Sequence, residues 1–459
     1  MTHSILQRSP TRAVLLLGLP LALASFFQAG FNLTEVWVFG QTGDGGASLS
    51  GAAVSDMLTA VFALLANGMA NAAVAQISRA TGAGDEVRAA AAARAVLFVG
   101  VILSIGSAFV GILADPLGQV FMSESSRGPG TAFLRIMGIG GVGTVFMVIT
   151  IGVLRARGDS IVPLILIATV SIATLGLEAA FVLGWFGLDP TGIEAAAWVT
   201  VILRILTSIW GFIAVSRSIK LRPPGTRRWV DRRVLREQLS LGFLSAIQQS
   251  LRVVGMLALV GLSTWLIAGE RGESVFRAMT LWTKIDIPMI MMAMAWGGGA
   301  APVVGMLLGA GRSHDAGRAA WTGAGIAAMA AVVNALLVML FAPALIGAFV
   351  PDDPSVVADT LELLDHVAPF YPLMAMGIAI GFVFNGAGDM RRPLIWDAVL
   401  LLVFQGGLAG LLVGTGLMAE GGFFLVLAIS GVLQGVVPMW FLKRREWGRR
   451  PTIEHVPVA

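Results

Sequence analysis

The sequence predicts an all-α polytopic membrane protein with twelve transmembrane helices in two pseudo-symmetric six-helix lobes. Three observations support this fold class: long apolar runs, the placement of Lys and Arg, and two turn motifs that recur at nearly the same spacing. Of the 459 residues, 56% are hydrophobic and only 13% are charged, which is about half the charged fraction of an ordinary soluble domain. A helix that crosses the bilayer needs about 20 consecutive, mostly apolar residues, and the runs reach that length.

Charged or turn-rich breaks divide the chain into twelve apolar segments. The first segment is too long for the apolar core of a cleavable signal peptide, so we expect it to be retained as a helix. Abundant glycine, with 57 residues, is typical of helices that pack closely in lipid. The predicted spans are 13–40, 50–78, 89–114, 131–154, 161–186, 191–216, 239–268, 276–308, 317–349, 358–386, 394–416 and 421–442.

The composition argues against several classes of chemistry. The absence of Cys excludes disulfides, thiol catalysis and thiolate metal sites. The four His residues are scattered without metal-ligand spacing, so we expect no metal site, no catalytic residues and no organic cofactor. The net charge of +4 comes from basic residues in short loops between apolar runs. That placement indicates membrane topology rather than a nucleic-acid partner.

The distribution of Lys and Arg predicts the orientation. With the N-terminus in the cytoplasm, the inside loops collect nearly all basic residues, whereas the outside loops hold only Arg127, Arg271 and Arg277. The outside loop 351–365 carries five acidic residues and no basic one. Cytoplasmic loops are enriched in Lys and Arg. We therefore expect a multi-pass protein of the bacterial inner (plasma) membrane with both termini in the cytoplasm.

A basic linker separates the two halves. Residues 1–216 are predicted to form the N-terminal lobe and 239–442 the C-terminal lobe, joined by the linker 217–238 and followed by a basic cytoplasmic tail, 443–459. Membrane lipid is the expected surrounding. The positive charge of the linker is interpreted as a topology signal rather than as a specific site for anionic lipid.

Two turn motifs repeat between the halves. Gly82-Ala83-Gly84 after the second segment matches Gly309-Ala310-Gly311 after the eighth, 227 residues later. Gly158-Asp159, four residues before Pro163, matches Gly388-Asp389 before Pro393, 230 residues later. Gly-Asp turns are common helix breakers, but the shared offset is not explained by that alone. Six helices restore the starting side of the membrane, so the two repeats are expected to be parallel, related by an axis along the membrane normal.

Ionisable residues inside the apolar segments point to a functional site. An ionisable side chain at bilayer depth is costly unless it is shielded, so it tends to mark an ion or substrate pathway. The predicted topology places Glu35, Asp56, Glu178 and Glu194 at similar depths in the N-terminal half. Clustered carboxylates there are expected to bind a proton, Na⁺ or a cationic substrate. Asp56 and Glu194 are also interpretable as solvated helix ends.

Two arginines accompany these acids in the same half. Arg204 lies in the sixth segment, and Arg135, in the fourth, is the nearest apparent counter-charge. In the other half, Lys284 and Asp286 lie two residues apart and so do not share a helix face. Both are candidate accessory residues. Pro20 lies in the same segment as Glu35, where a proline removes a backbone hydrogen bond and permits a hinge.

Taken in order, the motifs resemble those of the multidrug and toxic compound extrusion (MATE) family over almost the whole chain. The resemblance rests on Gly18-Leu19-Pro20 and Asn32-Leu33-Thr34-Glu35, on the repeated turns, and on Leu134-Arg135-Ile136 and Lys284-Ile285-Asp286. It implies a V-shaped pair of six-helix lobes that alternate in access. It also implies a secondary active efflux transporter in which H⁺ or Na⁺ enters as small organic cations leave.

The resemblance further implies a cation site in the N-terminal lobe. The positions that match the family's site are Glu35, Thr174, Glu178 and Thr200. The family usually has Asp at both acid positions and Asn where this chain has Thr174. These departures favour proton coupling, while Na⁺ bound at Glu35 and Glu178 stays open as the alternative. The expected oligomeric state is a monomer.

Three other functional classes fit the same residues less well. A flippase or exporter of lipid-linked oligosaccharides or metabolites commonly has fourteen helices and a more cationic cavity. An intramembrane enzyme would need a nucleophile–base pair or a metal set at depth. A passive channel fits poorly with a two-fold repeat and an off-axis acid cluster. Exchange transport is therefore the favoured hypothesis.

Overall fold

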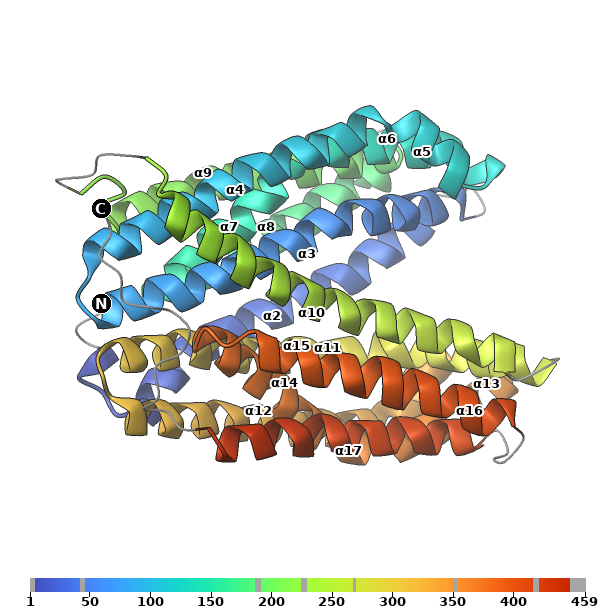
Figure 1. Ribbon diagram of the computed structural model, residues 1–459. Helices are drawn as coiled ribbons and strands as arrows, with labels where there is room; N and C mark the ends of the chain where they lie inside the picture. Colours follow the sequence, from blue (N-terminus) through green and yellow to red (C-terminus); the bar gives the residue numbers. More distant parts are fainter. Residues whose placement is uncertain are drawn as a thin grey trace. The chain divides into compact units, whose positions relative to one another are not determined.

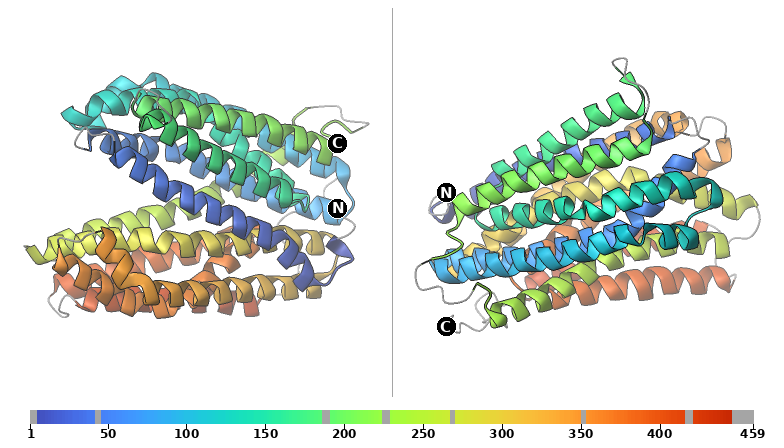
Figure 2. Two further views of the ribbon diagram at one scale, coloured as in Figure 1. Left: turned by 180° about the vertical axis from the view of Figure 1, so that it is seen from behind. Right: turned by 90° about the horizontal axis from the view of Figure 1, so that it is seen from above.

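The computed structural model describes residues 5–41, 46–185, 191–223, 229–266, 270–349, 353–415 and 421–445. Within these ranges every regular element is a helix (Figures 1 and 2). Residues 224–228 of the predicted linker and most of the predicted tail, 446–459, lie outside the described residues.

The described chain has enough apolar helices for the predicted number of spans. Eleven helices are long and apolar enough to cross a membrane, and the bent pair α6–α7 makes a twelfth if it counts as one span. The all-α, twelve-span fold class is therefore confirmed.

Contacts divide the chain into two compact units. Unit 1 consists chiefly of Leu23–Ala246, and unit 2 consists of Arg8–Ala22 and Ile247–Glu454. Within unit 1, α3 packs against α4, α6 and α7, and α9 packs against α7 and α8. The helices that belong entirely to unit 1 are α3 (Ala47–Gly82), α4 (Glu86–Ile112), α5 (Ala114–Phe121), α6 (Glu124–Ile139), α7 (Gly141–Ala156), α8 (Ile161–Val182) and α9 (Ile193–Ser218).

Unit 2 is built around α11, which packs against α12, α13 and α14, with α14 also against α17. Its core contains the side chains of Trp282, Met289, Tyr371 and Phe424, all nearly inaccessible. The helices that belong entirely to unit 2 are α11 (Glu270–Gly309), α12 (Ser313–Phe349), α13 (Pro354–Val367), η2 (Ala368–Phe370), α14 (Tyr371–Gly386), α15 (Arg391–Ala398), η3 (Val399–Leu408), α16 (Ala409–Gly414) and α17 (Gly421–Lys443).

Two long helices take part in both units. Helix α2 (Pro10–Gly40) passes from unit 2 to unit 1 after Ala22, and α10 (Arg232–Leu266) passes from unit 1 to unit 2 after Ala246. At 31 and 35 residues, they are about 46 and 52 Å long. The contact units thus differ from a simple division at the linker, because the first part of each half's leading helix packs with the other half.

The four repeated turns have one conformation. Gly84, Gly158, Gly311 and Gly388 all have φ between 74° and 82°, a left-handed conformation that glycine adopts without steric cost. After each glycine, the next N–H donates to a carbonyl five residues back, as in Asp85 to Ala80 and Asp389 to Phe384. This is the Schellman ending of a helix. The sequence repeat is therefore also a structural repeat at these four points.

Glycines allow the helices of unit 1 to approach through their backbones. A Cβ added to Gly138 of α6 would lie 2.5 Å from the Cα of Gly111 in α4. The Ser107 hydroxyl donates to the Gly138 carbonyl oxygen over 3.0 Å at the same crossing. Close approach of this kind is the main source of helix association in lipid, where the hydrophobic effect between helices is absent.

Three predicted single helices are interrupted. The predicted helix 131–154 is instead α6 and α7, bent by 47° at Gly140. Glycine favours such a kink because it adds no side chain to hold the helix straight. The predicted helix 394–416 contains a π-helical stretch, Val399–Leu408. By contrast, the predicted helices 276–308 and 317–349 correspond to α11 and α12, each of which is continuous.

The tenth predicted helix begins earlier and is also broken. Helix α13 starts at Pro354 with Asp353 as its N-cap, so most of the predicted outside loop 351–365 is helical. The pKa of Asp353 is held below its usual range because its carboxylate accepts hydrogen bonds from the Ser355 hydroxyl and the Val356 N–H. Pro372 lies in the first turn of α14, where a proline costs no helical hydrogen bond because the first N–H groups of a helix have no acceptor within it.

The crossing at Gly138 generates a stability prediction. We expect Gly138→Val to destabilise the protein by about 2 kcal/mol or more, because the new side chain overlaps the backbone of α4. Gly176→Val is the matched control, since a Cβ at Gly176 in α8 meets nothing within 4 Å. Thermal unfolding in detergent measures both variants. Equal losses of stability for the two variants would contradict the role of the crossing.

Candidate functional site

The Glu178 side chain is the centre of the candidate site. It lies in α8 and has 0% of its surface exposed. Thr200 of α9 donates its hydroxyl hydrogen to Oε1 of Glu178 over 2.8 Å. Oε2 has no hydrogen-bond partner among the described residues. Thr174, one turn earlier in α8, is also buried. Three of the four family-matched residues thus lie on two adjacent, packed helices.

Two further acids lie near Glu178. Glu35 on α2 is half-buried and Asp56 on α3 is exposed in the isolated chain. Electrostatic interaction links Glu35 with Asp56, and Glu178 with both. The structure therefore brings together, from α2, α3 and α8, three of the four acids that the sequence placed at similar depth.

Arg204 is the basic residue that accompanies this acid cluster. Its guanidinium interacts electrostatically with Glu35, Asp56 and Glu178. Arg204 follows Thr200 by one helical turn, so both side chains leave the same face of α9. Its Nη1 donates to the Thr144 hydroxyl of α7 over 3.1 Å. The cluster of three carboxylates thus contains one resident positive charge.

The predicted counter-charge, Arg135, lies elsewhere. Its Nη2 donates to both carboxylate oxygens of Asp115 in α5, at 2.8 and 2.6 Å. Both side chains are more than half exposed. The choice of Arg135 over Arg204 was wrong because α5, a short extra helix, was not foreseen in the sequence. Glu194, in the first turn of α9, is exposed.

Lys284 and Asp286, the candidate accessory residues of the C-terminal half, differ in burial. Lys284 is exposed, whereas Asp286 on α11 is 2% exposed. The Tyr371 hydroxyl donates to the Asp286 carboxylate, and the Trp282 indole donates to Tyr371 over 3.3 Å. Oδ1 of Asp286 has no hydrogen-bond partner among the described residues. Sequence reasoning missed Tyr371, although it is the chain's single tyrosine.

A second buried carboxylate in unit 2 is neutralised within the protein. Asp397 on α15 is 4% exposed. Arg252 of α10 donates to both of its oxygens, at 3.0 and 3.2 Å, and Gln248 donates to Oδ2 over 2.9 Å. This bidentate pair satisfies the charge of Asp397. It contrasts with Glu178, which has one hydroxyl donor only.

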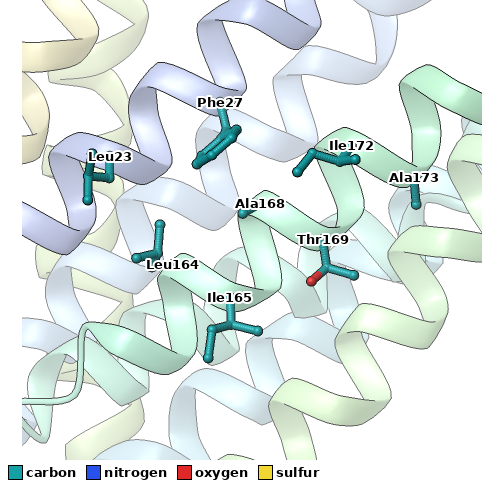
Figure 3. Close-up of a pocket in the computed structure, with 8 residues that line it drawn as sticks. All are labelled: Leu23, Phe27, Leu164, Ile165, Ala168, Thr169, Ile172 and Ala173. Atoms are coloured by element: carbon teal, nitrogen blue, oxygen red, sulfur yellow. The ribbon is translucent and has the colours of Figure 1, made fainter.

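An apolar groove lies along the helices that carry the two main acids. It has a volume of about 540 Å³ and lies between α2 and α8. Figure 3 shows Leu23 and Phe27 of α2 facing the side chains of α8. Thr169 is the one polar residue in its lining, which is completed by Leu164, Ile165, Ala168, Ile172 and Ala173. Glu35 follows Phe27 by eight residues, about two turns along α2, the helix that forms one wall of the groove.

This arrangement defines what the site can do chemically. A carboxylate buried in a membrane span costs several kcal/mol unless a proton or a cation compensates it. Thr200 supplies Glu178 with one hydrogen bond, and Arg204 offsets one of the three nearby acidic charges. The remaining acidic groups suit binding of protons or of a cation, with an apolar surface beside them.

The comparisons with known proteins agree with this fold. The MatE family model matches residues 20–179 and 253–406. The "Probable multidrug resistance protein NorM" of Thermotoga maritima is 23% identical over 390 residues, covering 80% of this chain and 81% of that protein. The "Multidrug resistance protein PmpM" of Pseudomonas aeruginosa is 22% identical, covering 94% and 88%.

Solved structures show the same fold at low sequence identity. "Crystal structure of MATE in the straight conformation" has a TM-score of 0.84 and 22% identity, with 96% of each chain covered. "Outward-facing conformation of a multidrug resistance MATE family transporter of the MOP superfamily" has a TM-score of 0.83, 22% identity and the same coverage. The fold and the site thus define a multi-pass membrane transporter. The chain belongs to the MatE family, and the predicted membership of the multidrug and toxic compound extrusion transporters is confirmed.

The bond between Thr200 and Glu178 generates a prediction. Thr200→Val leaves both oxygens of Glu178 without a donor, so we expect a loss of about 1–3 kcal/mol in unfolding free energy. The loss should vanish in a Glu178→Leu background. The exposed Thr169→Val is the control and should change stability by less than about 0.5 kcal/mol. Denaturant unfolding in detergent compares Thr200→Val, Glu178→Leu, the double variant and Thr169→Val with the unmodified protein, and an equal loss in the Leu background would refute the bond's contribution.

Proposed function

We propose that this protein is a secondary active efflux transporter that exports small organic cations in exchange for protons by alternating access. The observation that carries the proposal is the Glu178 carboxylate, which is fully buried, lies near Glu35 and Asp56, and has one oxygen without a hydrogen-bond partner in the described part of the chain. Such a group changes its interactions when it gains or loses a proton. The protein's family membership and its multidrug resistance relatives support this function.

The donor set favours H⁺ over Na⁺ as the coupling ion. A bound Na⁺ needs several oxygen ligands in one shell, whereas a proton needs one carboxylate. Among the described residues, no group of three His, Cys, Asp or Glu is arranged to hold a metal ion. Thr174 supplies a hydroxyl where the family has an amide carbonyl, and Oε1 of Glu178 is already bound to Thr200. Na⁺ at Glu35 and Glu178 is the second candidate, and no organic cofactor is assigned.

Exchange follows from competition for one negative charge. A substrate cation and a proton both compensate Glu35 and Glu178, so binding of one weakens binding of the other. Thermodynamic linkage makes this effect reciprocal, as antiport requires. Pro20 lies inside α2, two residues before Ala22, where the chain passes from one unit to the other. Bending there would let the part of α2 that carries Glu35 move without distorting the rest of the helix.

The groove indicates the shape of the substrate. An apolar groove of about 540 Å³ on the two helices that carry Glu35 and Glu178 suits an amphipathic molecule with an apolar body and a positive charge. Phe27 adds an aromatic face that can contact a flat organic cation. The proposal assigns no chemical conversion to the protein, so it is a carrier and not an enzyme.

The proposed location is the bacterial inner membrane, with both termini in the cytoplasm. The support comes from the excess of Lys and Arg in the loops assigned to the inside. We further propose that one copy is sufficient for transport, because the acids, Arg204 and the groove all belong to a single unit of one chain.

Transport in proteoliposomes tests the function directly. We expect export of ethidium from vesicles under an imposed pH gradient, and no export under an Na⁺ gradient alone at uniform pH. Export driven by Na⁺ alone would replace H⁺ by Na⁺ in the proposal. Secondary active exchange would be rejected if ethidium were concentrated across the membrane in the absence of both the H⁺ and the Na⁺ gradient. It would also be rejected if ethidium only flowed down its own gradient, without coupling to either ion.

Substitution of the two main acids tests their role. Glu35→Gln and Glu178→Gln imitate the protonated side chain and remove the exchangeable charge, so we expect a folded protein with at least about tenfold slower gradient-driven export. Glu35→Asp keeps the charge and should retain partial export. Glu194→Gln is the matched control, because Glu194 is an exposed acid outside the cluster, and it should export normally. Normal export by folded Glu35→Gln or Glu178→Gln protein would remove that residue from the mechanism.

A further inference from the structure

A set of buried polar side chains joins α3 to the first part of α10 within unit 1. Asn71 donates to the Ser245 hydroxyl over 3.1 Å, and Gln76 donates to the Gln238 side-chain oxygen over 3.2 Å. Gln238 also donates to the Met69 carbonyl oxygen over 2.7 Å. All four polar side chains are at most 8% exposed. We call Asn71, Gln76, Gln238 and Ser245 the polar seam.

The polar seam lies at a close crossing of the two helices. A Cβ added to Gly68 of α3 would lie 2.5 Å from the Gly242 carbonyl oxygen of α10. Ser245 follows Gly242 by three residues. The two backbones are therefore already in contact, and the seam adds hydrogen bonds on both sides of that contact.

An equivalent crossing in unit 2 has no such seam. There the first part of α2 crosses α11, and a Cβ added to Gly299 would lie 2.5 Å from the Cα of Gly18. A Cβ added to Gly18 would equally lie 2.5 Å from the Trp296 ring. In Ala13–Ala22 and Trp296–Leu308, the Trp296 indole is the one side chain with a polar atom. Leu21, which follows Gly18 by three residues, occupies the place that Ser245 has beside Gly242.

The two crossings differ in how they respond to water. Separating an apolar crossing in the wetted part of a transporter exposes apolar surface, which is unfavourable. Amide and hydroxyl groups exchange their mutual hydrogen bonds for bonds to water at little net cost. A buried polar seam therefore permits repeated separation and closure, whereas the contact of Trp296 with Gly18 favours a permanently packed crossing.

We propose that the α3–α10 crossing is the cytoplasmic gate of the transporter, and that it opens along the polar seam while the α2–α11 crossing stays closed. This inference rests on the proposed function, because the predicted topology places the first parts of α2 and α10 on the cytoplasmic side. Water and substrate enter from the cytoplasm past Asn71 and Ser245. The hydrogen bonds of the seam re-form when the gate closes.

Cysteine accessibility tests the gate cleanly, because the natural chain contains no Cys. Ser245→Cys and the matched Leu21→Cys are prepared in inside-out membrane vesicles and treated with a membrane-impermeant methanethiosulfonate reagent. We expect Ser245→Cys to react at least tenfold faster than Leu21→Cys when the imposed pH gradient has the direction that favours the cytoplasm-open state. Equal rates, a faster Leu21→Cys, or an unreactive Ser245→Cys under every gradient would overturn the proposal.

Cross-linking gives an independent readout. In Asn71→Cys/Ser245→Cys, a short bis-methanethiosulfonate reagent should abolish ethidium export, and a reductant should restore it. In Ala22→Cys/Ala295→Cys, taken from the apolar cluster beside the α2–α11 crossing, the same reagent should leave export intact. The opposite pattern would place the gate at the other crossing. Single-cysteine variants that export normally show that the folds are preserved.

The labelling result is separable from the proposed function. If the unmodified protein exports no ethidium in proteoliposomes, the proposed function fails. The ratio of labelling rates at Ser245→Cys and Leu21→Cys still reports which crossing opens, since it does not depend on the substrate.

Discussion

Close approach of helix backbones is the constraint on which this structure depends. Lipid tails are as apolar as the helix surfaces, so helices gain little from hiding apolar side chains from one another and must instead pack through small residues and hydrogen bonds. Gly111 with Gly138, Gly68 with Gly242 and Gly18 with Gly299 bring backbones into direct contact. The last two contacts hold the first parts of α10 and α2 in units 1 and 2, respectively. The same glycines thus determine how the two leading helices are shared.

A buried charge in a membrane span is energetically costly, and the candidate site depends on how that charge is compensated. Asp397 shows how this protein neutralises a buried carboxylate permanently, with a bidentate arginine and an amide donor. Glu178 differs from Asp397. Its Oε1 accepts one hydrogen bond from the Thr200 hydroxyl, and its Oε2 has no hydrogen-bond partner among the described residues. Arg204 donates to Thr144 and offsets part of the acidic charge. The site therefore has capacity for an exchangeable positive charge, as an exchanger needs.

The two units share the geometry of their turns but contain different polar side chains. The four Schellman turns at Gly84, Gly158, Gly311 and Gly388 have the same geometry. The polar side chains differ: unit 1 contains the acid cluster and the polar seam, while unit 2 closes its corresponding crossing with Trp296 against Gly18. Unit 2 has its own buried acid, Asp286, bonded to Tyr371. Because equivalent helices carry different chemistry, one crossing can open while the other holds the lobe together.

The sequence by itself determined the twelve-span fold class, the two-fold repeat and the main acids. These features depend on local properties: the length of apolar runs, glycines that adopt a left-handed turn, and the rarity of charges at bilayer depth. Only the tertiary structure decided the partners. It paired Arg135 with Asp115, placed Arg204 beside the acids, bent the fourth span at Gly140 and assigned the first part of α2 to unit 2. Partner choice depends on helix rotation and crossing, which arise from contacts between residues far apart in the chain, and no local pattern encodes them.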